Sequence, residues 1–296
     1  MSNCRLYVIT DEKGAALALD LMAEAFEDDG LPVATMEIDE VRGIWEVSVY
    51  LEREEERDAV AGRLSTCLDG ALSGLEIHTE ILPETDWIVH SLEGLKPVRA
   101  GRFLVHGAHD RHLVRAHDLA IEIDAAQAFG TGHHGTTAGC LDMLGMVMRA
   151  HPAGVRWFNP VLDLGTGSGV LAIAAARLAP VSVLATDIDP IATRIAAQNT
   201  QINRVAPRVK AVTAAGFHST AITGRMPYRL ILANILARPL MQMAPAISRA
   251  LAPGGSVILS GILASQRWKV IAAFNGQRLG HVRTIWRNGW VTIHLR

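Results

Sequence analysis

The sequence predicts an α/β protein in two parts, because the order of its expected helices and strands changes once along the chain. Up to about residue 82, four strands and two helices are expected. From about residue 129, short apolar strands alternate with helices, which is typical of a mostly parallel sheet covered on both faces. The 296 residues are 49% hydrophobic and only 5% aromatic. This composition excludes a disordered chain and suits an α/β core better than an all-β sandwich.

The first part has the order β-α-β-β-α-β. Strands are expected at Cys4–Thr10, Val33–Ile38, Ile44–Leu51 and Leu75–Ile81, and helices at Lys13–Glu27 and Glu54–Leu68. Leu17, Leu21 and Ala25 follow helical spacing, and the break at Gly30 ends that helix. This order is that of a small ferredoxin-like α+β domain, although many small binding domains share it.

Residues 83–127 connect the two parts. A short helix is expected at Asp86–Leu95, and extended segments at Arg102–His106 and His112–Ile123. The segment is too long for a plain loop, so we expect it to pack on one of the two parts. The predicted domains are therefore residues 1–82, a linker at residues 83–127, and residues 128–296.

The second part alternates regularly between helix and strand. Helices are expected at Thr136–Arg149, Leu171–Leu178, Ile191–Asn203, Leu240–Leu251 and Ala264–Phe274, and strands at Val161–Leu164, Val181–Thr186, Val209–Ala214, Leu230–Ala233 and Ser256–Ser260. Two final strands, Arg278–Trp286 and Trp290–Leu295, have no helix between them. They therefore predict one antiparallel edge of the sheet.

A glycine-rich turn follows the first strand of the second part and carries the strongest motif. Gly165, Gly167 and Gly169 let the backbone pass close beneath a ligand before a helix begins. The dinucleotide fingerprint needs G-x-G-x-x-G, and Val170 breaks that spacing. Asp187 ends the next strand, 22 residues after Gly165, where a carboxylate can accept both ribose hydroxyls of an adenosine. The pattern favours a Rossmann-like, class I methyltransferase site for S-adenosylmethionine. A nicotinamide oxidoreductase is the less favoured alternative.

Two further acidic residues flank this motif. Asp163 either hydrogen-bonds the loop amides or binds the ammonium of a methionyl group, and the sequence leaves both open. Asp189 precedes Pro190, which is common in the first turn of a helix, so we expect Asp189 to be an N-cap rather than a ligand.

Asn234 is the candidate catalytic residue. It follows the fourth strand of the alternating region, and ligands of open α/β sheets bind beyond such strand ends. Its amide offers an acceptor and a donor, and so suits an amine held toward a methyl donor. A simple turn-forming asparagine is the alternative. Base methyltransferases often have prolines after this position, and Ile235 and Leu236 argue against a nucleic-acid base as substrate.

The segment Ala128–Thr137 reads A-F-G-T-G-H-H-G-T-T and precedes a helix. It either caps that helix or forms a ligand-facing turn as well. The histidines nearby lie at positions 106, 109, 112, 117, 133 and 134, and their spacing matches no zinc pattern, so no metal is expected.

Taken together, these motifs resemble those of the ribosomal protein L11 methyltransferase (PrmA) family over essentially the whole chain. The most specific segments are Phe129–Gly132 with His134, Thr136 and Thr137, then Asp187–Pro190, Ala233–Leu236 and Leu259–Gln266. The resemblance implies that Thr137, Gly165, Asp187 and Asn234 contact S-adenosylmethionine. Gly167 and Ile188, from the same motifs, complete the expected cofactor site. Two positions depart from the family pattern, namely Gly135 in place of Pro and Ser91 in place of a second Trp after Trp87.

The resemblance implies transfer of methyl groups to lysine side-chain or N-terminal amines of ribosomal protein L11, free or in the large subunit. It also implies that the N-terminal domain recognises this protein and that the linker lets the domain swing. An RNA or small-molecule N-methyltransferase on the same fold is the alternative function. The motifs contain no clear general base, so we expect the amine to lose its proton to solvent as it enters a water-excluded site.

The net charge of −2 conceals two opposite halves. Residues 1–80 contain 6 Lys and Arg against 19 Asp and Glu, a charge of −13, and the remaining residues contain 22 against 11, a charge of +11. The acidic part is either a well-solvated domain or a docking surface for a basic ribosomal protein. We expect no direct reading of nucleic acid, no membrane span and a monomer. The three cysteines form no C-x-x-C motif, which favours a reducing, cytoplasmic location.

Overall fold

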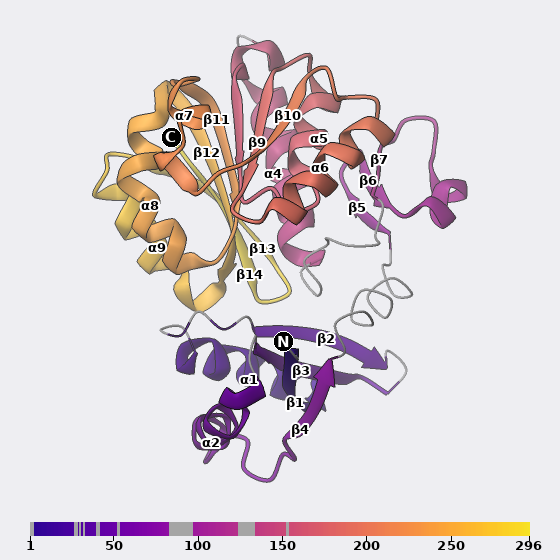
Figure 1. Ribbon diagram of the computed structural model, residues 1–296, viewed down its shortest axis with the longest axis vertical. Coiled ribbons are helices and arrows are strands. Elements are labelled where there is room, and N and C mark those ends of the chain that lie inside the picture. The colour runs from indigo at the N-terminus through magenta and orange to yellow at the C-terminus, as the bar shows by residue number, and fades with distance from the viewer. Residues whose placement is uncertain are drawn as a thin grey trace. The chain divides into compact units, whose positions relative to one another are not determined.

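The computed structural model describes residues 3–26, 29, 31, 33–39, 42–51, 54–82, 97–123, 134–151 and 154–296. The chain divides into two compact units, residues 1–93 and 94–296, each with its own sheet and helices (Figure 1). We describe each unit by itself.

The first unit is an antiparallel sheet with two helices. Its elements are β1 (Asn3–Asp11), α1 (Glu12–Ala25), β2 (Val33–Asp39), β3 (Ile44–Leu51), a 3-10 turn (Glu54–Glu56), α2 (Arg57–Leu68) and β4 (His78–Leu82). The strand order is β2-β3-β1-β4, and all neighbours are antiparallel. This is the arrangement that the β-α-β-β-α-β order predicts. Asp11 caps α1 by accepting a hydrogen bond from the Gly14 amide at 2.7 Å.

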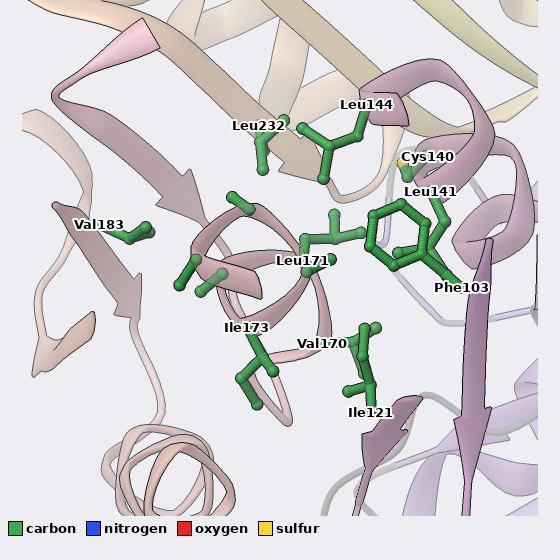
Figure 2. Close-up of a cluster of buried hydrophobic side chains, with 14 of the residues drawn as sticks. Phe103, Ile121, Cys140, Leu141, Leu144, Val170, Leu171, Ile173, Val183 and Leu232 are labelled. Carbon is green, nitrogen blue, oxygen red and sulfur yellow. The ribbon is translucent and has the colours of Figure 1, made fainter. Parts of the chain in front are cut away.

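A small three-stranded sheet opens the described part of the second unit. Its strands are β5 (Val98–Ala100), β6 (Phe103–His106) and β7 (Leu119–Glu122), and a 3-10 turn (Ala108–Leu113) lies between the last two. Phe103 and Ile121 lie beside Val170 and Leu171 in a buried apolar cluster (Figure 2). Residues 97–123 therefore pack within the second unit. The expected helix at residues 86–95 lies outside the described residues.

Only part of the expected extended segment His112–Ile123 pairs as a strand. The residues before β7 form turns because side chains hold them: Asp118 accepts from the Arg115 amide at 2.9 Å, and Arg99 donates to Asp118 at 3.0 Å. The exact division into domains at residues 82 and 128, and the roles given to those domains, stay a prediction.

The main sheet of the second unit has seven strands in the order β10-β9-β8-β11-β12-β14-β13. Its strands are β8 (Val161–Leu164), β9 (Val183–Asp187), β10 (Val209–Thr213), β11 (Tyr228–Asn234), β12 (Leu251–Leu263), β13 (His281–Arg287) and β14 (Trp290–Leu295). The first five strands in this order run parallel. Strand β14 is antiparallel to both β12 and β13. The predicted antiparallel pair is present, with the reversed strand one place inside the edge.

Helices cover both faces of this sheet (Figure 1). They are α4 (His134–Ala150), α5 (Val170–Leu178), α6 (Pro190–Ile202), α7 (Thr220–Thr223), α8 (Ala237–Ala250) and α9 (Arg267–Asn275). Alternate strand residues enter two cores: Leu230 and Leu232 pack with α4 and α5, and Ile231 packs with α7, α8 and α9. Helix α6 shares the face of α5, because both crossovers step in the same direction and are right-handed. This is the doubly covered, mostly parallel sheet that the alternating pattern predicts.

No helix in the described ranges is long and apolar enough to cross a bilayer. Of the three cysteines, Cys4 and Cys140 are buried and Cys67 is partly exposed.

Candidate functional site

The glycine turn after β8 has three glycines that share a positive φ and differ in the space around them. All have positive φ, at +71° for Gly165, +53° for Gly167 and +87° for Gly169, a region that costs other residues energy. A Cβ on Gly165 would clash with the side chain of Ile235, and one on Gly169 would lie 3.2 Å from Ala196 Cβ. At Gly167 the space is open. The turn is therefore packed tightly at both ends and open in the middle, where a ligand can approach the backbone.

Asp163 lies beneath this turn and is 1% exposed. Its Oδ2 accepts hydrogen bonds from Thr166 Oγ1 at 2.6 Å and from the Ala172 amide at 3.0 Å. These contacts tie the glycine turn to the start of α5, which supports the first of the two roles that the sequence left open. Its Oδ1 is buried and has no hydrogen-bond partner among the described residues. Burial raises the pKa of this carboxyl from 3.8 to about 6.

Asp187 ends β9 and faces the glycine turn. Its Oδ2 accepts from the Gly167 amide at 2.9 Å, and its Oδ1 accepts from the Asp189 amide at 3.1 Å. Each carboxylate oxygen can accept a second hydrogen bond, so the oriented carboxylate can still receive hydroxyl groups. Asp189 caps α6 through the Ile191 amide at 2.8 Å, as expected. The side chain of Ile188 is 75% exposed next to this carboxylate.

Asn234 ends β11, on the same carboxyl edge of the sheet. Its Nδ2 donates to Thr136 Oγ1 at 3.4 Å, and Thr136 lies in the first turn of α4 with 1% exposure. A pocket opens here, and its wall includes Thr136, Thr137, Gly165, Gly167, Asn234 and Trp290. Of the predicted site residues, the structure brings four into this wall. Asp187 is hydrogen-bonded to the wall at Gly167, and Ile188 lies outside it.

Two glycines in the elements around Asn234 leave no room for a Cβ. Gly261 of β12 has φ +79°, and a Cβ there would lie 2.7 Å from the carbonyl carbon of Ile235 and closer still to its oxygen. On α4, a Cβ on Gly139 would clash with the Thr292 hydroxyl of β14. The buried Ser260 hydroxyl lies 3.0 Å from Thr292 Oγ1. Strands β11, β12 and β14 and helix α4 are therefore packed without spare room around the turn that carries Asn234.

The described part of the pocket wall is uncharged. Among the described residues that line it, none is acidic, basic or a histidine; they are hydroxyl, amide, glycine and apolar residues. Such a wall can orient a neutral group and exclude water. These lining side chains include none whose ordinary pKa would let it accept a proton near neutral pH.

Three of the lining residues have roles that the sequence did not predict. Thr136 was noted as part of a motif and not as the partner of Asn234, and Gly261 only as part of the segment Leu259–Gln266. Trp290 gave no signal, because it reaches the pocket only through the position of β14 inside the sheet. Of the expected turn at Ala128–Thr137, residues 128–133 lie outside the described residues.

The histidines of the middle segment serve local structure. His106 is buried, and its Nδ1 lies 2.8 Å from the Gly107 carbonyl oxygen. His109 lies 3.0 Å from Asp110, and His117 lies 3.7 Å from Asp118. Within the part of the chain that the structure describes, no group of three or more His, Cys, Asp or Glu side chains is placed to hold a metal ion.

Comparison with known proteins identifies close relatives. Residues 7–296 match the family model described as ribosomal protein L11 methyltransferase (PrmA). The chain is 61% identical over 295 residues to the ribosomal protein L11 methyltransferase of Rhizobium meliloti (strain 1021), covering 100% of this chain and 99% of the relative. It is 60% identical over 296 residues to that of Agrobacterium fabrum, with the same two coverages. A crystal structure of ribosomal protein L11 methylase from Lactobacillus delbrueckii subsp. bulgaricus superimposes with a TM-score of 0.57 at 30% identity, covering 68% of this chain and 97% of that one.

Proposed function

This chain belongs to the ribosomal protein L11 methyltransferase family, and on that premise we propose that its pocket transfers methyl groups from S-adenosylmethionine to amines of ribosomal protein L11. One observation carries the proposal. The Asp187 carboxylate is oriented by a hydrogen bond from the glycine turn, and it lies beside an uncharged pocket wall that includes Asn234. The methyl acceptors are lysine side-chain amines, the N-terminal amine, or both.

The residues present fit the cofactor. The backbone at Gly167 is open on its ligand side, and the Asp187 carboxylate keeps acceptor capacity for two ribose hydroxyls. We assign cofactor contacts to Thr137, Gly165, Gly167, Asp187, Ile188 and Asn234. When bound, S-adenosylmethionine supplies an electrophilic methyl group on a sulfonium.

Asn234 is assigned the task of orienting the acceptor amine. Because its Nδ2 donates to Thr136, its Oδ1 is left to accept a hydrogen bond from the amine. An alkylamine has a pKa of about 10.4 and reacts only when neutral. The uncharged wall with Trp290 disfavours the ammonium form by desolvation, so the amine loses its proton to water on entry. Catalysis then rests on positioning rather than on a side-chain base.

The first unit is assigned to substrate recognition. Residues 1–80 carry a charge of −13, and an acidic surface of that size attracts a basic protein over a distance set by ionic strength. We propose the division into a recognition domain at residues 1–82, a linker at residues 83–127 and a catalytic domain at residues 128–296, in a monomer that acts in the cytoplasm. Association with the substrate should weaken strongly with added salt, and salt-independent association would remove the acidic-surface proposal.

The test is methyl transfer from tritiated S-adenosylmethionine to ribosomal protein L11 and, in parallel, to ribosomal RNA. We expect label in the protein amines only, located by mass spectrometry. Label in RNA instead would favour the alternative N-methyltransferase. The variant Asn234→Ala should lower the rate of methylation more than it lowers cofactor affinity. If it lowers only cofactor affinity, the orienting role of Asn234 is wrong.

A further inference from the structure

Three arginines gather at the opposite edge of the main sheet from the cofactor pocket. Arg177 lies in the last turn of α5, and Arg204 and Arg208 lie between the end of α6 and the start of β10. All three line one open surface depression, together with Leu119 and Asn203. Because α5 and α6 end where β9 and β10 begin, this depression lies at the amino edge of the parallel strands, whereas the cofactor pocket lies at their carboxyl edge.

Buried hydrogen bonds hold the floor of this depression. Asn203 is 3% exposed, and its side chain holds the backbone of Glu122 through two hydrogen bonds, from the Glu122 amide at 3.0 Å and to the Glu122 carbonyl at 2.6 Å. Arg204 has φ +56°, a left-handed conformation that residues with a side chain rarely adopt. The backbone at Arg204 therefore holds a conformation that is unfavourable for an isolated residue.

In the part of the chain that the structure describes, no carboxylate neutralises these three guanidiniums. Within the described ranges none of them forms an ion pair; Arg177 reaches only the oxygens of Asn203, at 3.4 and 3.5 Å, and Arg208 reaches the Ala179 carbonyl at 3.4 Å. The carboxylate of Glu122 is occupied by Arg111. Burial, and then the charges of Arg204 and Arg208, lower the pKa of Arg177.

The helix ends nearby offset only part of this charge. Each helix C-terminus carries about half a negative elementary charge, so the ends of α5 and α6 together balance about one guanidinium of the three. About two positive charges remain, which is the charge that one phosphate group balances. Guanidinium groups also match phosphate oxygens with paired hydrogen bonds.

We propose that Arg177, Arg204 and Arg208 form a binding site for a phosphate group, separate from the cofactor pocket. The site recognises phosphate oxygens and reads no bases. The same chemistry is offered by a small free phosphate and by the backbone of an RNA, and the two arms of the test separate them.

The test uses the full-length protein with two probes. Inorganic phosphate is followed by ³¹P NMR, and a short labelled single-stranded RNA of mixed sequence is followed by fluorescence anisotropy at low and moderate salt. The double variant R177Q/R204Q should weaken binding by about tenfold or more, because each guanidinium supplies charge-assisted hydrogen bonds. R194Q is the matched control, since Arg194 is an exposed arginine on α6 that does not line the depression.

Affinity for S-adenosylhomocysteine reports that each variant is folded. If R177Q/R204Q loses this affinity, the single variant R204Q carries the test, because the Arg204 side chain is exposed. Binding of phosphate alone supports a small-molecule site, and RNA binding that free phosphate displaces supports a backbone contact. The proposal is overturned if the natural protein binds neither probe, or if the double variant binds both probes as well as R194Q does.

Discussion

Replacing Gly261 by alanine, with Gly289→Ala as its control, tests whether the turn that carries Asn234 depends on a close backbone approach. The two glycines have nearly the same φ, +79° and +77°. Alanine in this left-handed region costs about 1–2 kcal/mol at either position. A Cβ at Gly289 meets nothing within 4 Å, whereas at Gly261 it lies 2.7 Å from the Ile235 carbonyl carbon. That neighbour is backbone and cannot rotate away, so overpacking adds about 1–3 kcal/mol.

We therefore expect Gly289→Ala to lower the free energy of unfolding by about 1–2 kcal/mol and Gly261→Ala to lower it by about 2–5 kcal/mol. Urea denaturation at constant m-value measures both. Calorimetric titration with S-adenosylhomocysteine should show weaker binding for Gly261→Ala only, because the displaced Ile235 backbone forms part of the pocket wall. Equal losses of stability in the two variants, or full cofactor affinity in Gly261→Ala, would refute this reasoning.

Three further outcomes follow from the site. Asp187→Asn should weaken cofactor binding by about 10- to 100-fold, because it removes a charged hydrogen-bond acceptor. The control Asp189→Asn keeps the helix cap and should leave cofactor binding unchanged. Equal calorimetric affinities of the two variants would exclude the ribose contact. Thr136→Val should lower kcat by about tenfold at saturating cofactor, since the Asn234 amide loses its partner, and a change in KM alone would contradict this positioning role. The carboxyl of Asp163 has a pKa of about 6 when folded and 3.8 when exposed, so between these values the folded state holds the extra proton and stability falls as pH rises. In urea unfolding from pH 4 to 7, the free energy of unfolding of the natural protein should fall by roughly 3 kcal/mol through this group, and that of Asp163→Asn should not. Parallel pH profiles of the two proteins would show that the burial argument is wrong.

The strands of the main sheet were predictable because burial on both faces leaves a continuous apolar run, as in residues 230–233. Strand ends were harder to predict. Strand β12 spans Leu251–Leu263, although only Ser256–Ser260 was expected, because Pro253 and two glycines read as a break. In the structure this segment lies where the pairing with β11 shifts register, so the strand continues past the irregularity. Strand β5 has only three residues and no periodic pattern to detect.

Contacts between residues of one strand-turn-helix-strand unit were also predictable. Gly165 and Asp187 belong to one strand-turn-helix-strand unit, and the Gly167–Asp187 hydrogen bond spans 20 residues. The Thr136–Asn234 contact spans 98 residues and exists only after the sheet has assembled. The place of Trp290 depends on the insertion of β14 between β12 and β13, and no local pattern near Trp290 shows that topology.

That insertion sets an order of events during synthesis on the ribosome. Strand β13 emerges from the exit tunnel before β14, yet it has no hydrogen-bonding partner on the sheet until β14 has paired with β12. Until then β12 presents an unpaired edge, the kind of surface on which chains aggregate. The same step brings in Trp290, so a nascent chain can form its glycine turn and still lack one wall of the cofactor pocket. The wall that Trp290 contributes is therefore complete only after β14 has paired with β12.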